Sequence, residues 1–326
     1  MMLSKKMIGV FALSLLLFSC SGEADNSTST STTPTPLART TTPKRFLFDA
    51  TKAQTAGNAD WVICENSSGT PIRFPNPLQS TVTATTLENY WRGGISAWGI
   101  ALAKEGHSVE TLAPGASITY GSTTNAQDLS RYDVYVVDEP NILFTAAQKT
   151  AIMNFVKNGG GLFMIADHNV SDRNNDGSDS PKIWNDLMNN NTVQNNPFGL
   201  AVELTNFSQT STNVLPDATN TILNGSQGAV TKLKFSAGAS IKLTPTANST
   251  VKGLIWKTGL ARTSTTGVMC ASSTFFAGRV VLITDSSPAD DGTGNPSDTL
   301  YPGWTEVSGN HARLHLNASY WLAKLQ

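Results

Sequence analysis

The sequence predicts an α/β fold with a mostly parallel sheet and helices on both faces. Residues 134–137 and 162–166 are continuous apolar runs, which are typical of strands buried on both sides of a sheet. Between them, apolar residues recur at helical spacing from Ala147 to Val156. This strand–helix–strand order predicts a right-handed βαβ crossover. We therefore expect a flavodoxin-like or Rossmann-like sheet.

The other elements follow from the same reasoning. Thr145 and Gln148 have the spacing of a capping box, so the crossover helix should begin there. Three glycines at 159–161 should end it and allow a left-handed turn. A polar, Asn-rich stretch at about 189–250 predicts a β-rich insertion. Further strands are expected at 45–49, 108–112, 233–235, 240–243, 251–256, 267–272 and 279–284, and helices at 88–105, 181–188 and 310–325.

The first twenty residues have the features of an export signal. Lys5 and Lys6 precede an apolar stretch at 8–18 that is too short to span a bilayer. The stretch ends at Cys20 and resembles the lipobox of bacterial lipoproteins, in which this cysteine carries the lipid. We expect export and a membrane anchor through Cys20 in the cell envelope, on the periplasmic face or at the cell surface. An ordinary signal peptide is the alternative.

Composition separates a tether from a single large domain. Residues 21–43 are mainly Ser, Thr and Pro and predict a flexible tether, whereas residues 44–326 are long enough for one α/β domain. The formal net charge is −1 at pH 7 and no basic patch is present, which argues against nucleic acid as a partner. Cys64 and Cys270 either pair as a disulfide or remain buried thiols.

Four predicted strands end in an aspartate: Asp49, Asp138, Asp167 and Asp285. Carboxyl ends of parallel strands share one edge of the sheet, where ligands bind in such folds. Gathered carboxylates repel one another unless a cation or a shared proton neutralises them. Aspartates that merely form turns or cap helices are the alternative.

Histidines add to this predicted site. His168 directly follows Asp167, and His311 and His315 are spaced to share one face of the last helix. We expect Asp167, His168 and Asp285 to carry the chemistry, with Asp49 and His311 as weaker members. A divalent metal held by the carboxylates is one possible participant.

A second motif predicts calcium. Asp172, Asn174 and Asp176 alternate, and Gly177 follows at the sixth position, as in calcium loops. Asp179 would supply a further ligand. The twelfth position is Ile183 rather than Glu, so the loop is not a full EF-hand, and a solvated Asx-turn loop is the alternative.

The stretches YDVYVVDEP and FTAAQKTAIMNFVKNGGGLFMIADH resemble the class I glutamine amidotransferase-like superfamily. They are most similar to its trehalose-utilisation-type branch, which lacks amidotransferase activity. Asp167 and His168 stand where true amidotransferases have a cysteine, so glutamine hydrolysis is not implied. The stretches QTAGNADW, DRNNDG and DDGTGNP are similar to a secreted subgroup described as hydrolases, in which a His is expected near Lys52.

Two classes of function remain open from the sequence. The first is an exported, metal-assisted hydrolase of a small or glycan-related substrate. The second is a non-catalytic lipoprotein that binds a small-molecule or glycan ligand at the same edge. The gathering of ionisable residues favours the enzyme, whereas Lys52 and the lack of a nucleophile motif favour the binding protein.

Overall fold

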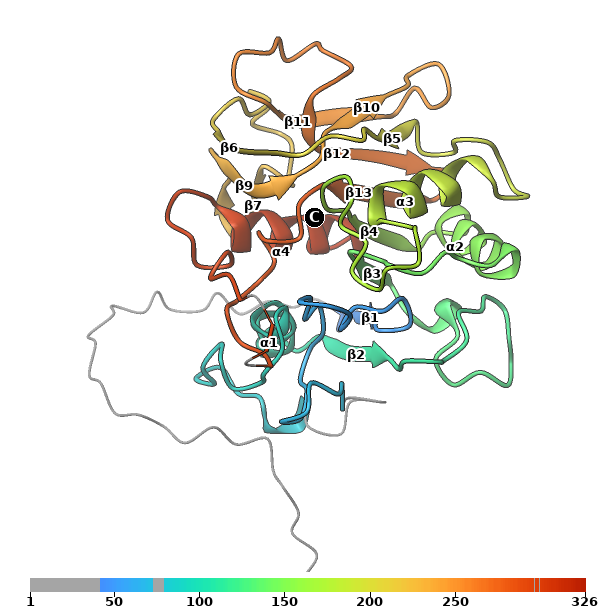
Figure 1. Ribbon diagram of the computed structural model, residues 1–326, viewed down its shortest axis with the longest axis vertical. Coiled ribbons are helices and arrows are strands. Elements are labelled where there is room, and N and C mark those ends of the chain that lie inside the picture. The colour runs from blue at the N-terminus through green and yellow to red at the C-terminus, as the bar shows by residue number, and fades with distance from the viewer. Residues whose placement is uncertain (1–41, 73–78, 296, 299) are drawn as a thin grey trace, which may run out of the picture.

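The computed structural model describes residues 42–72, 79–295, 297–298 and 300–326, and shows an α/β fold (Figure 1). The predicted export signal, Cys20 and nearly all of the predicted tether lie outside these residues. In the described part, no helix combines the length and apolar composition of a transmembrane span. The α-helices are α1 (Ser96–Lys104), α2 (Ala146–Lys157), α3 (Ser180–Asn189) and α4 (His311–Leu322), and short 3-10 helices occupy Gln79–Thr81 and Leu129–Arg131.

The main sheet has a parallel half that contains the predicted strands. Five neighbouring strands run parallel in the order β2-β1-β3-β4-β13. Their bounds are β1 (Arg45–Asp49), β2 (Ser108–Leu112), β3 (Val134–Asp138), β4 (Gly161–Ile165) and β13 (Gly278–Ile283). The predicted flavodoxin-like sheet is confirmed, including β2 at its edge.

The sheet continues through antiparallel strands. β12 pairs with β13, and β10, β5 and β11 follow beyond it. Their bounds are β5 (Leu200–Val202), β10 (Ile241–Leu243), β11 (Lys252–Trp256) and β12 (Val268–Phe275). Two small two-stranded sheets pair β6 (Phe207–Ser211) with β9 (Leu233–Gly238), and β7 (Asn224–Gly225) with β8 (Gly228–Ala229). Part of the predicted insertion therefore extends the main sheet, through β5 and β10, and part of it forms the two small separate sheets.

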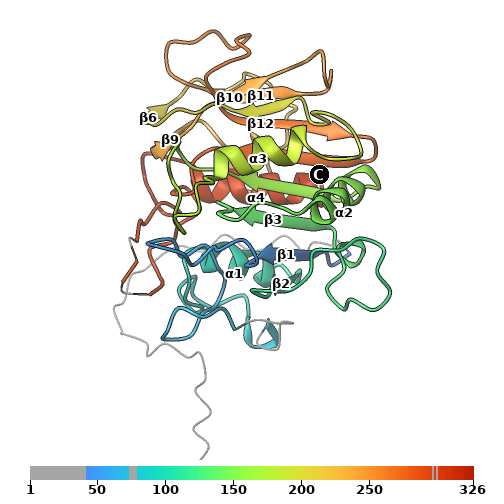
Figure 2. The ribbon, with the colours of Figure 1, turned by 45° about the vertical axis from the view of Figure 1, so that its right-hand side comes forward.

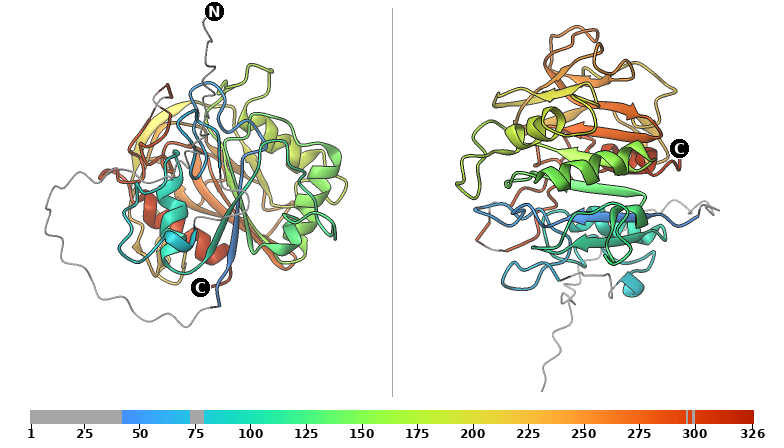
Figure 3. Two further views of the ribbon diagram at one scale, coloured as in Figure 1. Left: turned by 90° about the horizontal axis from the view of Figure 1, so that it is seen from below. Right: turned by 90° about the vertical axis from the view of Figure 1, so that its right-hand side faces the viewer.

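Helices cover both faces of the sheet. Seen from below, α1 and α4 lie on one side and α2 and α3 on the other (Figure 3). In the turned view the strands of the sheet run across the picture, one above another, with α2 and α3 in front of them (Figure 2). One apolar core contains Trp98 and Phe163 and the other contains Trp184 and Tyr135, all fully buried. This two-sided burial explains the unbroken apolar runs of β3 and β4.

The first helix is shorter than the sequence predicted. It begins at Ser96 rather than near Glu88, because Gly93 has φ +132° and cannot continue a helix. Gly94 lies so close to the carbonyl of Asp60 that a side chain would clash there. By contrast, α2 begins as predicted, with both hydrogen bonds of the Thr145–Gln148 capping box present.

The two cysteines outside the export signal are both buried and are not bonded to each other. Cys64 follows the loop after β1, and Cys270 lies in β12. Of the two alternatives that the sequence left open, the structure has the buried thiols. Burial raises the pKa of the Cys270 thiol, so this group is not a reactive nucleophile.

Candidate functional site

A cavity of about 200 Å³ opens beside the carboxyl ends of β4 and β13. We call it the His168 pocket. It lies where α/β sheets of this kind bind ligands. Residues from four separate segments line it: Asn58, Trp61, Asp167, His168, Arg173, Ser236, Ala237, Ser286, Ser287 and Tyr301.

Glu139 forms hydrogen bonds with residues from three of the segments that line the His168 pocket. This fully buried residue follows β3, and its carboxylate accepts hydrogen bonds from Trp61 Nε1 at 2.6 Å and Ser286 Oγ at 2.9 Å. Arg173 Nε donates a third at 2.7 Å. The backbone of Glu139 has φ +39°, a conformation that a residue other than glycine adopts only where its surroundings impose it. This backbone conformation therefore places the Glu139 carboxylate within hydrogen-bond distance of three residues that line the pocket.

Arg173 supplies the positive charge that the gathered carboxylates require. Besides Glu139, its Nη2 donates to Asp167 Oδ2 at 2.9 Å. Its backbone N–H donates to Asn141, and its Nη1 donates to Asn58. The sequence argument allowed a cation or a shared proton at this edge, and in the structure an arginine side chain supplies positive charge there.

His168 lies on the pocket wall beside Asp167. Its Nδ1 is 2.7 Å from the carbonyl oxygen of Asn169, so this nitrogen carries the proton. Its Nε2 is 3.7 Å from Asp167 Oδ2. Burial, together with the carboxylates of Glu139 and Asp285, raises the pKa of Asp167, while Arg173 acts in the opposite direction. The arrangement places a group that can accept a proton next to one that can release it.

Asp285 and Asp138 lie behind the His168 pocket rather than in its wall. Asp285 Oδ2 accepts backbone N–H groups of Ser236 and Ala237, and Oδ1 accepts that of Ser287. It thereby holds three lining residues in place. Asp138 is buried, and neither of its oxygens has a hydrogen-bond partner among the described residues. Burial, then the charges of Glu139, Asp290 and Asp285, raises the pKa of Asp138 well above its usual value.

The weaker members of the predicted site are engaged elsewhere. Asp49 accepts hydrogen bonds from Tyr135 OH, Gln54 Nε2 and both the N–H and the hydroxyl of Thr51. It therefore closes the turn after β1.

His311 is held by backbone on both sides. Its Nδ1 contacts the carbonyl oxygen of Gly303, and its Nε2 accepts the N–H of Lys234. His315 is fully buried and stacks on Phe163. The structure thus brings Asp167, His168 and Asp285 together, while Asp49 and His311 have structural contacts.

Lys52, at the position where the family resemblance leads one to expect a histidine, is also structural. Its Nζ donates to Gln148 Oε1 at 2.7 Å and lies over the ring of Phe144. It therefore joins the turn after β1 to the first turn of α2. Burial lowers the pKa of Lys52, and the nearby Asp49 acts in the opposite direction.

The predicted calcium loop is closed by its own side chains. Asp172 accepts the N–H groups of Asp176 and Gly177, and Asp176 accepts that of Ser178. Asp179 caps α3 through Lys182 N and also accepts the N–H of Val170. No three His, Cys, Asp or Glu side chains in the described residues are grouped to hold a metal. Calcium here would need Asn174 or backbone carbonyls as additional ligands.

Calcium binding at this loop stays a prediction with a direct test. At a calcium concentration a hundredfold above the dissociation constant, linkage should stabilise the fold by about 2.7 kcal/mol. We expect the melting temperature to fall on adding a chelator and to recover with calcium. Asp176→Asn keeps the side chain's shape but removes its charge, and should abolish the response. Equal melting temperatures of the native chain with calcium and with chelator would contradict the prediction.

No protein-family model matches the sequence, and a comparison with curated proteins finds no match. Solved structures with a similar fold include the N-terminal domain of mmIFT52, at TM-score 0.50 and 11% identity over 85% of this chain and 97% of that one. A ThuA-like protein from Parabacteroides merdae aligns at TM-score 0.42 and 11% identity over 87% and 91%.

A beta-galactosidase from Rahnella aligns at TM-score 0.41 and 14% identity over 87% of this chain, which spans only 32% of that enzyme. At these identities the likeness concerns the fold alone.

Sequence reasoning missed Glu139, Arg173 and Ser286 as members of the site. Glu139 and Ser286 each directly follow an aspartate that the sequence did single out, Asp138 and Asp285. Arg173 lies inside the predicted calcium loop, one residue after Asp172. Attention to the residue next to each strand-end aspartate would have found two of the three.

Proposed function

We propose that the protein is a hydrolase that acts outside the cytoplasm on a small hydroxylated substrate, such as a glycan fragment, in the His168 pocket. The observation that carries the proposal is the pairing of His168 Nε2 with Asp167 at 3.7 Å in a cavity wall. Trp61 and Tyr301 add aromatic side chains, and Ser287 adds a hydroxyl-bearing side chain, to the lining of the same cavity. Sugars present both apolar faces and hydroxyl groups to such walls.

In this mechanism His168 and Asp167 each carry out one of two proton transfers. Hydrolysis removes a proton from the attacking water and delivers one to the leaving oxygen. His168 Nε2 accepts the first proton, because Nδ1 already donates to the carbonyl of Asn169. Asp167, whose pKa is raised by burial, delivers the second. Arg173 holds Asp167 in position and stabilises the carboxylate that the transfer leaves behind.

A divalent metal at the strand ends, which the sequence suggested, is given no step in this mechanism. Both oxygens of Asp285 accept backbone N–H groups, and Asp167 is bonded to Arg173. These two carboxylates are therefore engaged in hydrogen bonds and do not form a set of free metal ligands. Arg173 provides the positive charge that a metal would have supplied.

The proposal is tested by substituting His168 in the full chain. Aryl glycosides and unmodified oligosaccharides serve as the substrate panel. His168→Gln should lower kcat/KM by roughly a hundredfold or more, the usual contribution of a positioned acid or base. Its melting temperature should stay close to that of the native chain, because the ring is partly exposed. Lys252→Met, on a distant surface, is the control.

Two results would count against the hydrolase. Turnover by His168→Gln at the native rate would remove the role given to His168. Binding of a panel sugar without any hydrolysis by the native chain would instead favour a non-catalytic binding protein. One observation favours the binding protein: the carboxylates of Asp285 and Glu139 are already hydrogen-bonded to residues that line the pocket, so they are not free to act on a substrate.

We further propose that the chain is exported and anchored through a lipid on Cys20. The basis is the lipobox-like sequence, since residues 1–41 lie outside the described structure. Cys20→Ser should move the protein from the membrane fraction to the soluble fraction of the producing cells. An unchanged distribution of Cys20→Ser between the fractions would contradict the anchor.

A further inference from the structure

A second cavity adjoins the His168 pocket. It has a volume of about 80 Å³, and we call it the Lys234 pocket. Three residues line both cavities: Ser236, Ser287 and Tyr301. Beyond this common wall, the Lys234 pocket is lined by Lys234, Glu306 and His311, among others. The two cavities are therefore neighbouring compartments rather than separate surface hollows.

The size of the compartments indicates how they are used. Small-molecule sites usually measure about 300–1,000 Å³. The His168 pocket, at 200 Å³, and the Lys234 pocket, at 80 Å³, each fall below that range. Together the two compartments approach the lower end of that range, so one small ligand that reaches past the shared residues would use both, with its smaller part beside Lys234.

The charges of the lining residues are balanced in each compartment. In the His168 pocket, Arg173 is paired with the buried Glu139 at 2.7 Å, and burial raises the pKa of the neighbouring Asp167, which carries a proton in the proposed mechanism. In the Lys234 pocket, Lys234 Nζ is paired with Glu306 Oε2 at 2.7 Å. Burial lowers the pKa of His311, which keeps this ring neutral. Neither compartment presents an unbalanced charge, so the site favours a neutral ligand over an ionised one.

Polar groups remain available to such a ligand. The lysine ammonium has three N–H donors, and Glu306 accepts one of them in the contacts of the described residues. The side chain of Lys234 is 37% exposed and belongs to the lining of the cavity. Tyr301, whose backbone N–H donates to the buried Asp290, lines both compartments.

We propose that the Lys234 pocket is a second subsite of the His168 pocket, and that the two together bind a neutral saccharide of at least two units. This inference rests on the proposed function for its substrate class. One unit occupies the His168 pocket, and a hydroxyl-bearing part of the next accepts a hydrogen bond from Lys234.

The test compares ligand length in three proteins. Glucose, cellobiose and maltose are the neutral probes, digalacturonate is the charged one, and binding to the full chain is measured by calorimetry. At least one disaccharide should bind more tightly than glucose. Lys234→Ala should weaken that binding about tenfold, the usual effect of one lost hydrogen bond, and leave glucose binding unchanged.

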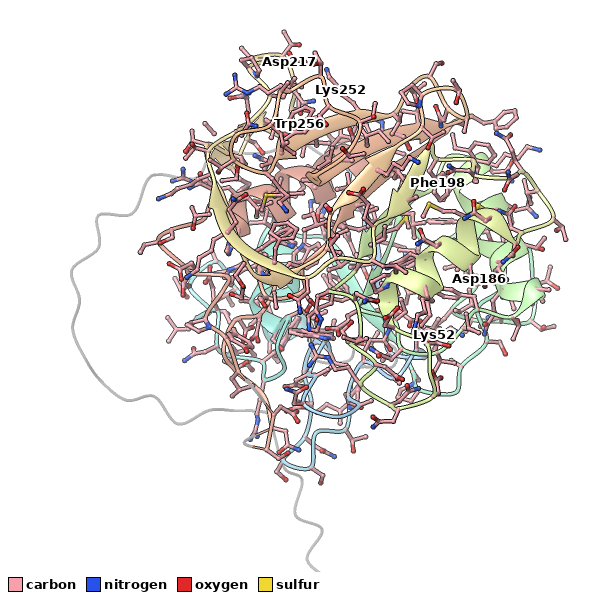
Figure 4. All side chains as sticks on the ribbon, turned by 45° about the horizontal axis from the view of Figure 1, so that its top comes forward. Lys52, Asp186, Phe198, Asp217, Lys252 and Trp256 are labelled. Atoms are coloured by element: carbon pink, nitrogen blue, oxygen red, sulfur yellow. The ribbon has the colours of Figure 1, made fainter. Side chains whose placement is uncertain are left out.

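Lys252→Ala is the matched control. Lys252 also pairs with a single carboxylate, that of Asp217, at 2.7 Å. Figure 4 shows this pair at the end of the molecule away from Lys52. Lys252→Ala should bind every probe as the native chain does.

The outcomes separate the subsite from the hydrolase. Equal losses of glucose and disaccharide binding in Lys234→Ala, binding of no neutral probe, or tighter binding of digalacturonate would each overturn the subsite. A disaccharide bound in a Lys234-dependent manner, but never hydrolysed, would support the subsite and overturn the hydrolase. Turnover that depends on His168 but not on ligand length would support the hydrolase and overturn the subsite.

Discussion

Replacing Arg173 with methionine should cost about 3–5 kcal/mol of folding free energy, the usual penalty for removing one partner of a buried ion pair. Arg173 contacts two carboxylates that are almost fully buried, those of Glu139 and Asp167. Methionine keeps much of the packing volume but leaves the buried Glu139 without its cation and Asp167 without its hydrogen-bond donor. Chemical denaturation at neutral pH, with the native chain as reference, measures the loss.

Two companion variants make this expectation specific. Lys252→Met breaks an exposed pair with Asp217 and should cost much less, because solvent screens exposed ion pairs. Adding Glu139→Gln to Arg173→Met removes the stranded charge and should recover part of the lost stability. A cost for Arg173→Met no larger than that for Lys252→Met would show that the carboxylates do not depend on Arg173.

The parallel half of the fold followed from local patterns. The apolar runs of β3 and β4, the capping box of α2 and the glycines after it are each specified within a few residues. The same holds for the strand-end positions of Asp167 and Asp285. These features depend on burial and backbone conformation, both of which leave a direct trace in the sequence.

Other features depended on contacts between distant segments. The late start of the predicted 88–105 helix, at Ser96, reflects the close approach of Gly94 to Asp60. The partner of Asp167 is Arg173, but the second partner of Arg173, Glu139, comes from a different strand end. Spacing along the chain cannot show which of several charged residues will meet across a fold. For the same reason, the sequence could not separate Asp49, which closes a turn, from Asp167, which lines the pocket.

Asp138 should make the protein less stable as the pH rises. Its pKa is raised well above the usual value, first by burial and then by the charges of Glu139, Asp290 and Asp285. In the unfolded chain an aspartate ionises near pH 3.9. Between that pH and the higher pKa of the folded state, the unfolded chain releases a proton that the folded chain keeps. Each pH unit in this interval should therefore cost about 1.4 kcal/mol.

Asp138→Asn removes this ionisation while nearly preserving the shape of the side chain. Denaturation at pH 4 and at pH 7 should show the variant gaining stability relative to the native chain as the pH increases. Asp217→Asn is the control of opposite sign, because hydrogen bonds from Lys252 and Thr219 lower the pKa of Asp217 to about 2. Its side chain contributes stability above the unfolded pKa, so its removal should bring no gain at pH 7. A stability difference between Asp138→Asn and the native chain that stays constant from pH 4 to pH 7 would mean that folding does not raise the pKa of Asp138.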